Sequence, residues 1–241
     1  MTTQEFHASH PFPTTPQRDA DELDRLNVPY DGQTRMRLTI ASGMAGARIR
    51  IDPSATDLIA IDCGGGTPPR LRVSASELKV SWPVTPATIG SWLRAALAGE
   101  HRNIEIVLHP AVEWTLELRG GLSRFEADLT SGKLERLEVS GGVSETRFDL
   151  PAPGAVVPIR ISGGASDLAL RRPADTGVAL AVSGGISGLC LDNQGFDAIG
   201  GNARLTSGLV HGDAPCYAVE ISGGASSLQI VSSSRLERSL Q

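Results

Sequence analysis

The sequence predicts an all-β fold: a single-domain β-solenoid in which coils of about 21 residues stack on one another, with one short helical insert. Three observations support this prediction. Five segments align without gaps around a repeated Gly-Gly pair. Apolar and polar residues alternate on both sides of that pair, as in half-buried strands. Aromatic residues make up only 4% of the chain, so the core is mainly aliphatic, which suits a narrow layered interior.

The five aligned segments define the repeat. Their first residues are separated by 21, 22, 21 and 39 residues. The last separation is close to two repeats, so we expect one irregular coil inside it, around residues 196–210. The segments begin at Leu116, Leu137, Ile159, Leu180 and Val219.

Positions within each repeat are counted from zero at its first residue. Offsets 0 and 2 are always aliphatic, offsets 4 and 5 are always glycine, and offset 7 is always serine. Offsets 9 and 11 are mostly apolar, with Thr146 as the polar exception. Side chains alternate faces along a strand, so the inward set changes parity between offsets 6 and 9. This change predicts a bend, and each repeat is therefore interpreted as two short strands joined by a Gly-Gly-Φ-Ser corner, where Φ is apolar.

We interpret the corner residues as structural. The glycine at offset 4 is expected to point inward where there is no room for a Cβ atom, and the glycine at offset 5 to adopt a positive φ. The serine is expected to hydrogen-bond nearby backbone, and stacking would align the serines in a ladder. The predicted turn residues are Gly120, Gly121, Ser123, Gly141, Gly142, Ser144, Gly163, Gly164, Ser166, Gly184, Gly185, Ser187, Gly223, Gly224 and Ser226.

The same template extends towards the N-terminus in a weaker form. The segment from Leu38 has aliphatic residues at offsets 0 and 2 and Met44 at offset 6, although Ser42-Gly43 replaces Gly-Gly. We interpret it as a degenerate first coil. Three further stretches alternate like strands: residues 58–61, 71–80 and 104–108.

The domain boundaries follow from where the repeat pattern fails. Residues 1–35 are polar and proline-rich and are predicted to be a disordered tail, with a short helical turn over residues 19–26. Residues 36–232 form the predicted solenoid domain. Within it, residues 86–99 have helical apolar spacing and are predicted to form an amphipathic helix that caps the stack or covers an edge. Residues 233–241 are a polar tail or cap.

Composition argues against several classes of function. A net charge of −5 argues against a nucleic-acid surface, and no run of 18 apolar residues predicts a membrane span. The N-terminus has no basic segment followed by an apolar one, so we expect a cytoplasmic protein. Three cysteines without metal-ligand spacing are interpreted as small buried residues or idle thiols, and a contact between Cys190 and Cys216 stays open.

The sequence gives little support for a catalytic site or a metal site. Asp128, Asp149 and Asp192 share offset 12 and could form a column, but this position lies on the outer face, where carboxylates are usually solvated. Asp167 stands at a different position, offset 8. The five histidines form no ligand pair, and a serine repeated in every coil is more plausibly structural than a nucleophile. We therefore predict no catalytic residue, no metal, no cofactor and no small-molecule substrate.

Trp82, Trp92 and Trp114 lie near the predicted helix or just before the first clear coil. Exposed aromatic side chains often mark a binding patch. Large rings more often serve packing, and we favour the interpretation that they anchor the helix on the end of the stack.

The recurring Ser-Gly-Gly-Φ-Ser motif, present at residues 140–144, 162–166, 183–187 and 222–226, resembles the bacterial putative-adhesin or toast-rack family. The resemblance covers Met36 to Val231 and implies a β-solenoid fold of unknown function with an adhesion-related name. It supplies no catalytic residues. The favoured function is therefore a non-catalytic scaffold that binds an unknown protein partner or self-associates. The alternative is a carbohydrate-binding or carbohydrate-active β-helix.

Overall fold

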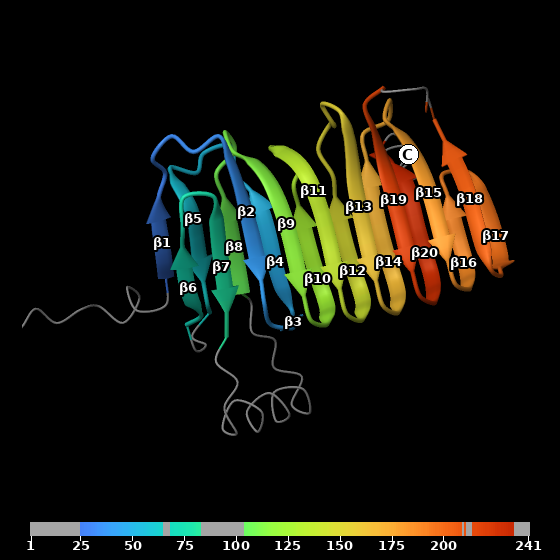
Figure 1. Cartoon of the computed structure of the whole chain (residues 1–241), viewed down its shortest axis with the longest axis horizontal. Coiled ribbons are helices and arrows are strands. Elements are labelled where there is room, and N and C mark those ends of the chain that lie inside the picture. Colours follow the sequence, from blue (N-terminus) through green and yellow to red (C-terminus); the bar gives the residue numbers. More distant parts are fainter. Residues whose placement is uncertain (1–24, 65–67, 83–103, 209, 211–213, 234–241) are drawn as a thin grey trace, which may run out of the picture.

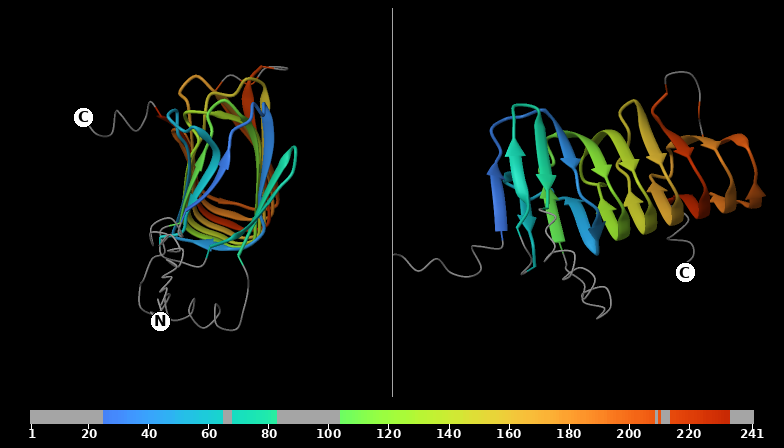
Figure 2. Two further views of the ribbon diagram at one scale, coloured as in Figure 1. Left: turned by 90° about the vertical axis from the view of Figure 1, so that its left-hand side faces the viewer. Right: turned by 60° about the horizontal axis from the view of Figure 1, so that its bottom comes forward.

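The protein is an all-β chain whose strands form two sheets, seen here in a computed structural model (Figure 1). The structure describes residues 25–64, 68–82, 104–208, 210 and 214–233. The two sheets lie face to face, and corners join them along one side of the molecule (Figure 2). Neither sheet closes on itself, because both end in edge strands.

The larger sheet has 11 strands within the described residues. Its central strands run parallel, as expected for strands that repeat the same two-strand pattern. In spatial order they are β1 (Arg25–Pro29), β5 (Asp57–Asp62), β8 (Ile104–Leu108), β4 (Ala47–Ile51), β10 (Leu122–Asp128), β12 (Val143–Asp149), β14 (Ala165–Arg172), β20 (Ala225–Ser232), β16 (Ile186–Leu191) and β17 (Gln194–Ile199), while the short β3 (Met44–Ala45) pairs with β10.

The smaller sheet has nine strands within the same residues and is also parallel at its centre. Their spatial order is β18 (Asn202–Ser207), β15 (Gly177–Ser183), β19 (Cys216–Ser222), β13 (Val156–Ser162), β11 (Lys133–Ser140), β9 (Glu113–Arg119), β2 (Arg35–Ile40), β7 (Glu77–Ser81) and β6 (Arg70–Val73).

Each repeat supplies one strand to each sheet, and we call this pair of strands with its corner a unit. In the β11–β12 unit, Leu137 and Val139 point inward from the smaller sheet and Phe148 from the larger one, and all three are buried. Phe148 contacts Phe125 of the preceding unit, with ring centroids 5.7 Å apart. Because every unit contributes side chains at the same positions, the units together bury one continuous core.

The order of the units in space differs from their order in the chain. The last unit does not follow its predecessor in the stack: β19–β20 lies between β13–β14 and β15–β16. The reason is that β17 and β18 run antiparallel to β16 and β15 and cover the far edge of the stack. The next unit therefore pairs on the other side of β15–β16.

The predicted irregular coil consists of β17, a corner at Gly200 and Gly201, and β18. It crosses from the larger sheet to the smaller one, which is the reverse of the other units. The opposite end of the stack also carries reversed strands, since β5 is antiparallel to β8 and β6 is antiparallel to β7.

The segment from Leu38 forms β2, β3 and β4 and packs beside the β9–β10 unit. Leu38 pairs with Leu116, and Met44 pairs with Leu122, in the register of the repeat. The other alternating stretches form β5, β6, β7 and β8.

The predicted disordered tail over residues 1–35 requires a correction. β1 pairs antiparallel with β5, and β2 already begins at Arg35. Leu26 and Val28 alternate with polar residues and pack against the core, which makes this segment a strand, and no helical turn forms at residues 25–26. The predicted helix over residues 86–99 and most of the predicted C-terminal tail lie outside the described residues.

Candidate functional site

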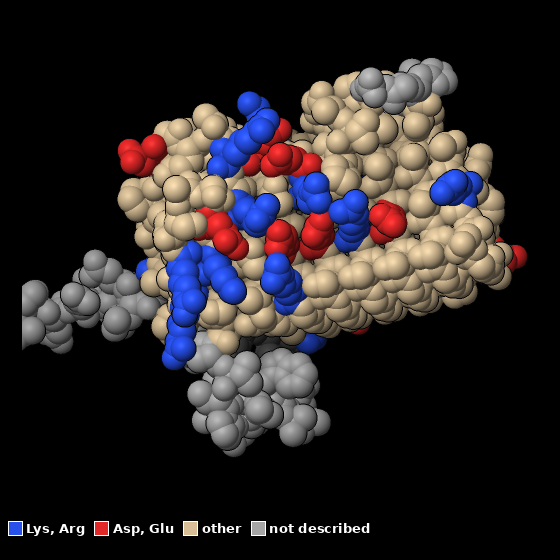
Figure 3. All heavy atoms as spheres, viewed as in Figure 1, with Lys and Arg blue, Asp and Glu red and all other residues tan. Residues whose placement is uncertain are grey.

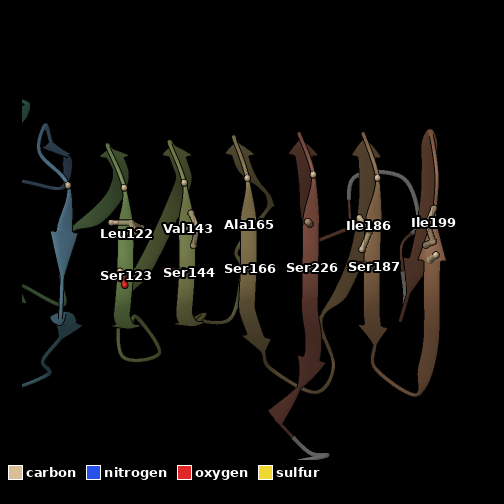
Figure 4. Close-up of a pocket in the computed structure, with 18 of the residues that line it drawn as sticks. Leu122, Ser123, Val143, Ser144, Ala165, Ser166, Ile186, Ser187, Ile199 and Ser226 are labelled. Atoms are coloured by element: carbon tan, nitrogen blue, oxygen red, sulfur yellow. The ribbon is translucent and has the colours of Figure 1, made fainter. Parts of the chain in front are cut away.

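The corners form a continuous surface along the stack, which we call the corner surface. It encloses a shallow groove of about 1180 Å³ (Figure 4). Among the described residues that line this groove there is no lysine, arginine, aspartate or glutamate. In the space-filling view it borders an uncharged band along the lower edge of the molecule (Figure 3). The corner surface comprises residues 43–45, 121–123, 142–144, 164–166, 224–226, 185–187 and 198–200, in spatial order.

The first glycine of each corner allows close contact between units. Gly163 has a φ of +118°, and a Cβ added to it would lie 2.6 Å from the carbonyl oxygen of Gly141. An added Cβ would lie 2.4 to 2.5 Å from a glycine carbonyl oxygen at Gly141, Gly184 and Gly223, and 2.8 Å from the amide nitrogen of Gly43 at Gly120. These first glycines are therefore required by the lack of space as well as by the backbone conformation. Their backbones also hydrogen-bond between units: the amide of Gly163 donates to the carbonyl of Ser222 at 2.9 Å. The other members are Gly120, Gly141, Gly184 and Gly223.

The second glycine behaves differently, and the expectation of a positive φ at this position is wrong. The left-handed conformation falls on the first glycine instead, where the chain turns out of the smaller sheet. At Gly142, Gly164 and Gly185 an added Cβ would meet no atom within 4 Å. The fold therefore does not need glycine at these three positions. Their bare backbone lines the groove.

The serines at offset 7 form a ladder along the stack. Ser144 pairs with Ser166, Ser166 with Ser226, and Ser226 with Ser187, so the ladder follows the spatial order of the units. In the described part of the chain, the hydroxyls of these serines and of Ser123 make no hydrogen bond to the corner backbone, contrary to the sequence-based expectation. Backbone bonds between units hold the corner without them. Their side chains are half-buried or exposed on the corner surface.

A feature that the sequence interpretation missed explains the change of parity. The residue at offset 8 adopts a left-handed conformation in every regular unit, including the non-glycine residues Glu145 (φ 48°), Asp167 (φ 50°) and Ser227 (φ 53°). This single residue turns the chain into the larger sheet and shifts the inward positions by one. Non-glycine residues rarely adopt this conformation, so the positions are strained. The change of parity is visible in the sequence, but it does not identify which residue adopts the left-handed conformation.

The outer faces of the sheets carry charges that pair between units. Arg48 contacts Glu126 at 2.6 Å, and Arg160 lies between Glu138 at 3.5 Å and Glu220 at 3.4 Å. Figure 3 shows such positive and negative side chains side by side on one face. These pairs are largely exposed, so each contributes little to stability.

Asp52, which lies outside the groove, has an altered pKa. Hydrogen bonds from the side chain and backbone of Ser54, together with one from Arg50, lower the pKa of Asp52 to about 2. This aspartate lies in the turn that follows β4 and forms no part of the groove.

The three aspartates at offset 12 do not form a column. Asp128 pairs with Asp149, but Asp149 pairs on its other side with Arg171 and forms an ion pair with Arg147 at 3.1 Å. The out-of-order β19–β20 unit separates this pair from Asp192. The three carboxylates therefore cannot act on one substrate.

Asp192 instead holds a buried cation. Arg172 is only 2% exposed and donates hydrogen bonds to Asp192 and to the carbonyl of Thr176. Asp192 also accepts hydrogen bonds from the side chain of Ser207 and, at 3.0 Å, from the backbone amide of Ser232. This cluster joins the ends of β14, β16, β18 and β20. No local sequence pattern predicts this cluster, because the order of the units in space, and not in the chain, brings these strand ends together.

The remaining candidates have structural surroundings. Trp114 is fully buried in β9 and its indole Nε1 donates to the carbonyl of His109 at 3.0 Å, so it packs in the core. Trp82 packs partly against the core, and Trp92 lies outside the described residues. Cys190 and Cys216 belong to different sheets. Over the described residues, no three His, Cys, Asp or Glu side chains gather as metal ligands.

Comparisons with known proteins agree with this geometry at the level of the fold. Neither a protein-family model nor a curated protein matches the chain. Among solved structures, the chain is similar to a putative cell adhesion protein from Clostridium sporogenes, with a TM-score of 0.59 and 17% sequence identity over 86% of this chain and 97% of that chain. The likeness is one of fold.

A putative adhesin from Bacteroides fragilis matches over the same shares of both chains, with a TM-score of only 0.31 at 11% identity. In the part of the chain that is described, no helix has the length and apolar character needed to cross a membrane.

Proposed function

We propose that this chain is a non-catalytic, adhesin-like β-solenoid scaffold that uses its corner surface to bind a protein partner or a second copy of itself. The observation that carries the proposal is the second glycine of each corner. At Gly142, Gly164 and Gly185 neither backbone conformation nor packing within the chain requires glycine. Bare backbone at a repeated position is typical of a site where another molecule approaches closely.

The character of the groove supports a protein partner. Its described lining residues carry no charge, so the groove is unsuited to phosphate or nucleic acid, which require clustered lysine and arginine. It presents exposed backbone, serine hydroxyls and the apolar edges of the corners. A partner that lies along the stack would meet the same contacts in every unit.

The carbohydrate alternative has less support. Its motivating column of aspartates is interrupted by Arg171. A shallow polar groove on the smaller sheet is lined by Glu117, Arg119 and Arg160 among others, but it has no aromatic residue on which a sugar ring could stack. The charged groups that line it are engaged in ion pairs with their neighbours.

The test is affinity capture with chemical crosslinking from native host cells. The wild-type protein is compared with a variant carrying Gly142→Glu, Gly164→Glu and Gly185→Glu. The fold tolerates side chains at these positions, so circular dichroism should be unchanged. The partner captured by the wild type should be lost. Retention of the same partner by the folded variant would refute the role of the corner surface.

A matched control adds three carboxylates elsewhere. Ala169, Ala181 and Ala218 lie half-buried on the outer faces of the sheets, away from the groove. The triple glutamate variant at these positions carries the same added charge. It should capture the partner as the wild type does, which separates an effect of position from an effect of charge.

A further inference from the structure

The β19–β20 unit is inserted between two units that precede it in the chain. Its strand Cys216–Ser222 pairs with Val156–Ser162 on one side and with Gly177–Ser183 on the other. Its strand Ala225–Ser232 is likewise paired on both sides, with β14 and β16. The unit thus fills a slot whose two walls are complete units of the same kind.

The walls of the slot are equivalent in register. Ile159 and Leu180 both pair with Val219, and Ala165 and Ile186 both pair with Ala225. The slot can therefore accept any unit that pairs in this register, whether the unit comes from the same chain or from another copy. An identical unit from a second copy meets the same partners on both sides.

Specific contacts also tie the inserted unit to the slot. The buried hydroxyl of Tyr217 donates to the carbonyl of Pro151 at 2.6 Å, outside the strand ladder. The amide of Ser232 donates to Asp192, which also holds Arg172 of the opposite wall. These contacts join the unit to the walls and not to its own link, so a unit from another chain can make all of them.

The link to the inserted unit joins β18 to β19, two strands that lie on either side of β15. β18 ends at Ser207, which pairs with Val178, and β19 begins at Cys216, which pairs with Gly177. The eight residues 208–215 therefore join two points on either side of one strand. Fully extended, eight residues span about 28 Å, whereas β18 and β19 are separated by two strand spacings, together about 10 Å. The length of the link therefore does not by itself tie the unit to the slot of its own chain.

We propose that β19–β20 exchanges between two copies of this chain, each copy placing its last unit in the slot of the other to give a two-fold symmetric dimer. Such exchange creates a dimer at low cost, because every contact of the closed monomer is retained. The proposal goes beyond the proposed function, because the exchange joins two copies through the slot and not through the corner surface. Binding of another protein at the corner surface does not depend on it.

The test uses disulfide trapping in a background with the three native cysteines replaced by alanine. One chain carries Ser162→Cys and a second chain carries Ser222→Cys, at positions that pair across the slot. Neighbouring strands lie about 4.8 Å apart, within the Cα separation that a disulfide accepts. The chains are unfolded together, refolded at high concentration and oxidised. A covalent dimer of the two variants is expected on a non-reducing gel.

The control pair is Ser140→Cys with Ser162→Cys, on separate chains. These positions also pair in register, but between two units that follow each other in the chain and are not exchanged. This mixture should give no covalent dimer on the non-reducing gel. The proposal is overturned if the mixture of the Ser162→Cys and Ser222→Cys chains also gives no covalent dimer, while a single chain that carries both cysteines forms the disulfide within itself.

Light scattering of the unmodified protein gives a second readout that needs no variant. After refolding, the dimer fraction should rise with the concentration at which the protein is refolded. A strict monomer at every refolding concentration would contradict exchange, while leaving the capture result at the corner surface unaffected.

Discussion

The two glycines of one corner make a matched pair for a stability test. Gly163 and Gly164 are adjacent in sequence and both lie on the outside of the same turn. Gly163 has a φ of +118° and an added Cβ would lie 2.6 Å from the oxygen and 2.9 Å from the carbon of the Gly141 carbonyl. Gly164 has no positive φ and open space around its Cβ position. Alanine should therefore destabilise the protein strongly at Gly163 and not at Gly164.

The magnitudes follow from these distances. At Gly163, overpacking against rigid backbone costs about 1 to 3 kcal/mol, and the unfavourable φ adds a further cost of about 1 to 3 kcal/mol. Gly163→Ala should thus lower the free energy of unfolding by about 2 to 6 kcal/mol, a large part of the 5 to 15 kcal/mol typical of a domain. Gly164→Ala restricts the unfolded chain without a clash, so it should be neutral or stabilising by up to about 1 kcal/mol.

The assay is urea unfolding followed by far-ultraviolet circular dichroism. The midpoint should fall strongly for Gly163→Ala and stay or rise slightly for Gly164→Ala. Equal midpoints for the two variants, or a larger loss at Gly164, would refute the division of roles between the two glycines.

Three other perturbations test separate parts of the fold. Glu145→Gly should stabilise by up to about 1 kcal/mol in the same urea assay, because it relieves a left-handed backbone at a non-glycine residue; a lower midpoint would show that the Glu145 side chain contributes more than its strain costs. Asp192→Ala should destabilise by about 3 kcal/mol, because it leaves the buried cation of Arg172 without its carboxylate; Asn at the same position removes the charge but keeps one acceptor oxygen and should cost less, and equal losses for the two variants would show that the hydrogen bonds to this oxygen contribute nothing. The pKa of Asp52 is depressed to about 2 by Ser54 and Arg50, so its contribution is fully present above the unfolded value of 3.8 and is lost as the pH falls towards 2. Thermal unfolding of Asp52→Asn should therefore differ from wild type at pH 6 and converge with it near pH 2, and a difference that persists at pH 2 would contradict this assignment.

Much of the local architecture is predictable from the repeats. The alternation around residues such as Leu137 and Val139 predicts which side chains are buried, and the change of parity predicts a bend. Both signals are local and depend only on strand geometry.

The parts that were missed depend on contacts between units. The first glycine of the corner is constrained by the carbonyl of a neighbouring glycine, as Gly163 is by Gly141, which no single repeat reveals. The place of the β19–β20 unit depends on the reversed β17–β18 covering one edge, a competition between strands far apart in the chain. The interruption of the aspartate column and the cluster around Asp192 both follow from that order.

The corner surface was predictable as a ladder of serines but not as a groove. Its second glycine was assigned a conformational role, because glycine in a turn usually has one. Only the open space around Gly142, Gly164 and Gly185 shows that the fold leaves these positions free to accept a side chain. Their repetition therefore becomes evidence about binding.

The most direct test of the central claim is the dissociation constant of the captured partner for wild-type protein and for the variant with glutamate at Gly142, Gly164 and Gly185. The account predicts that binding weakens about tenfold or more, which corresponds to about 1.4 kcal/mol, while the urea midpoint stays within about 1 kcal/mol of wild type. An unchanged dissociation constant for the folded variant would contradict the claim that this protein functions through its corner surface.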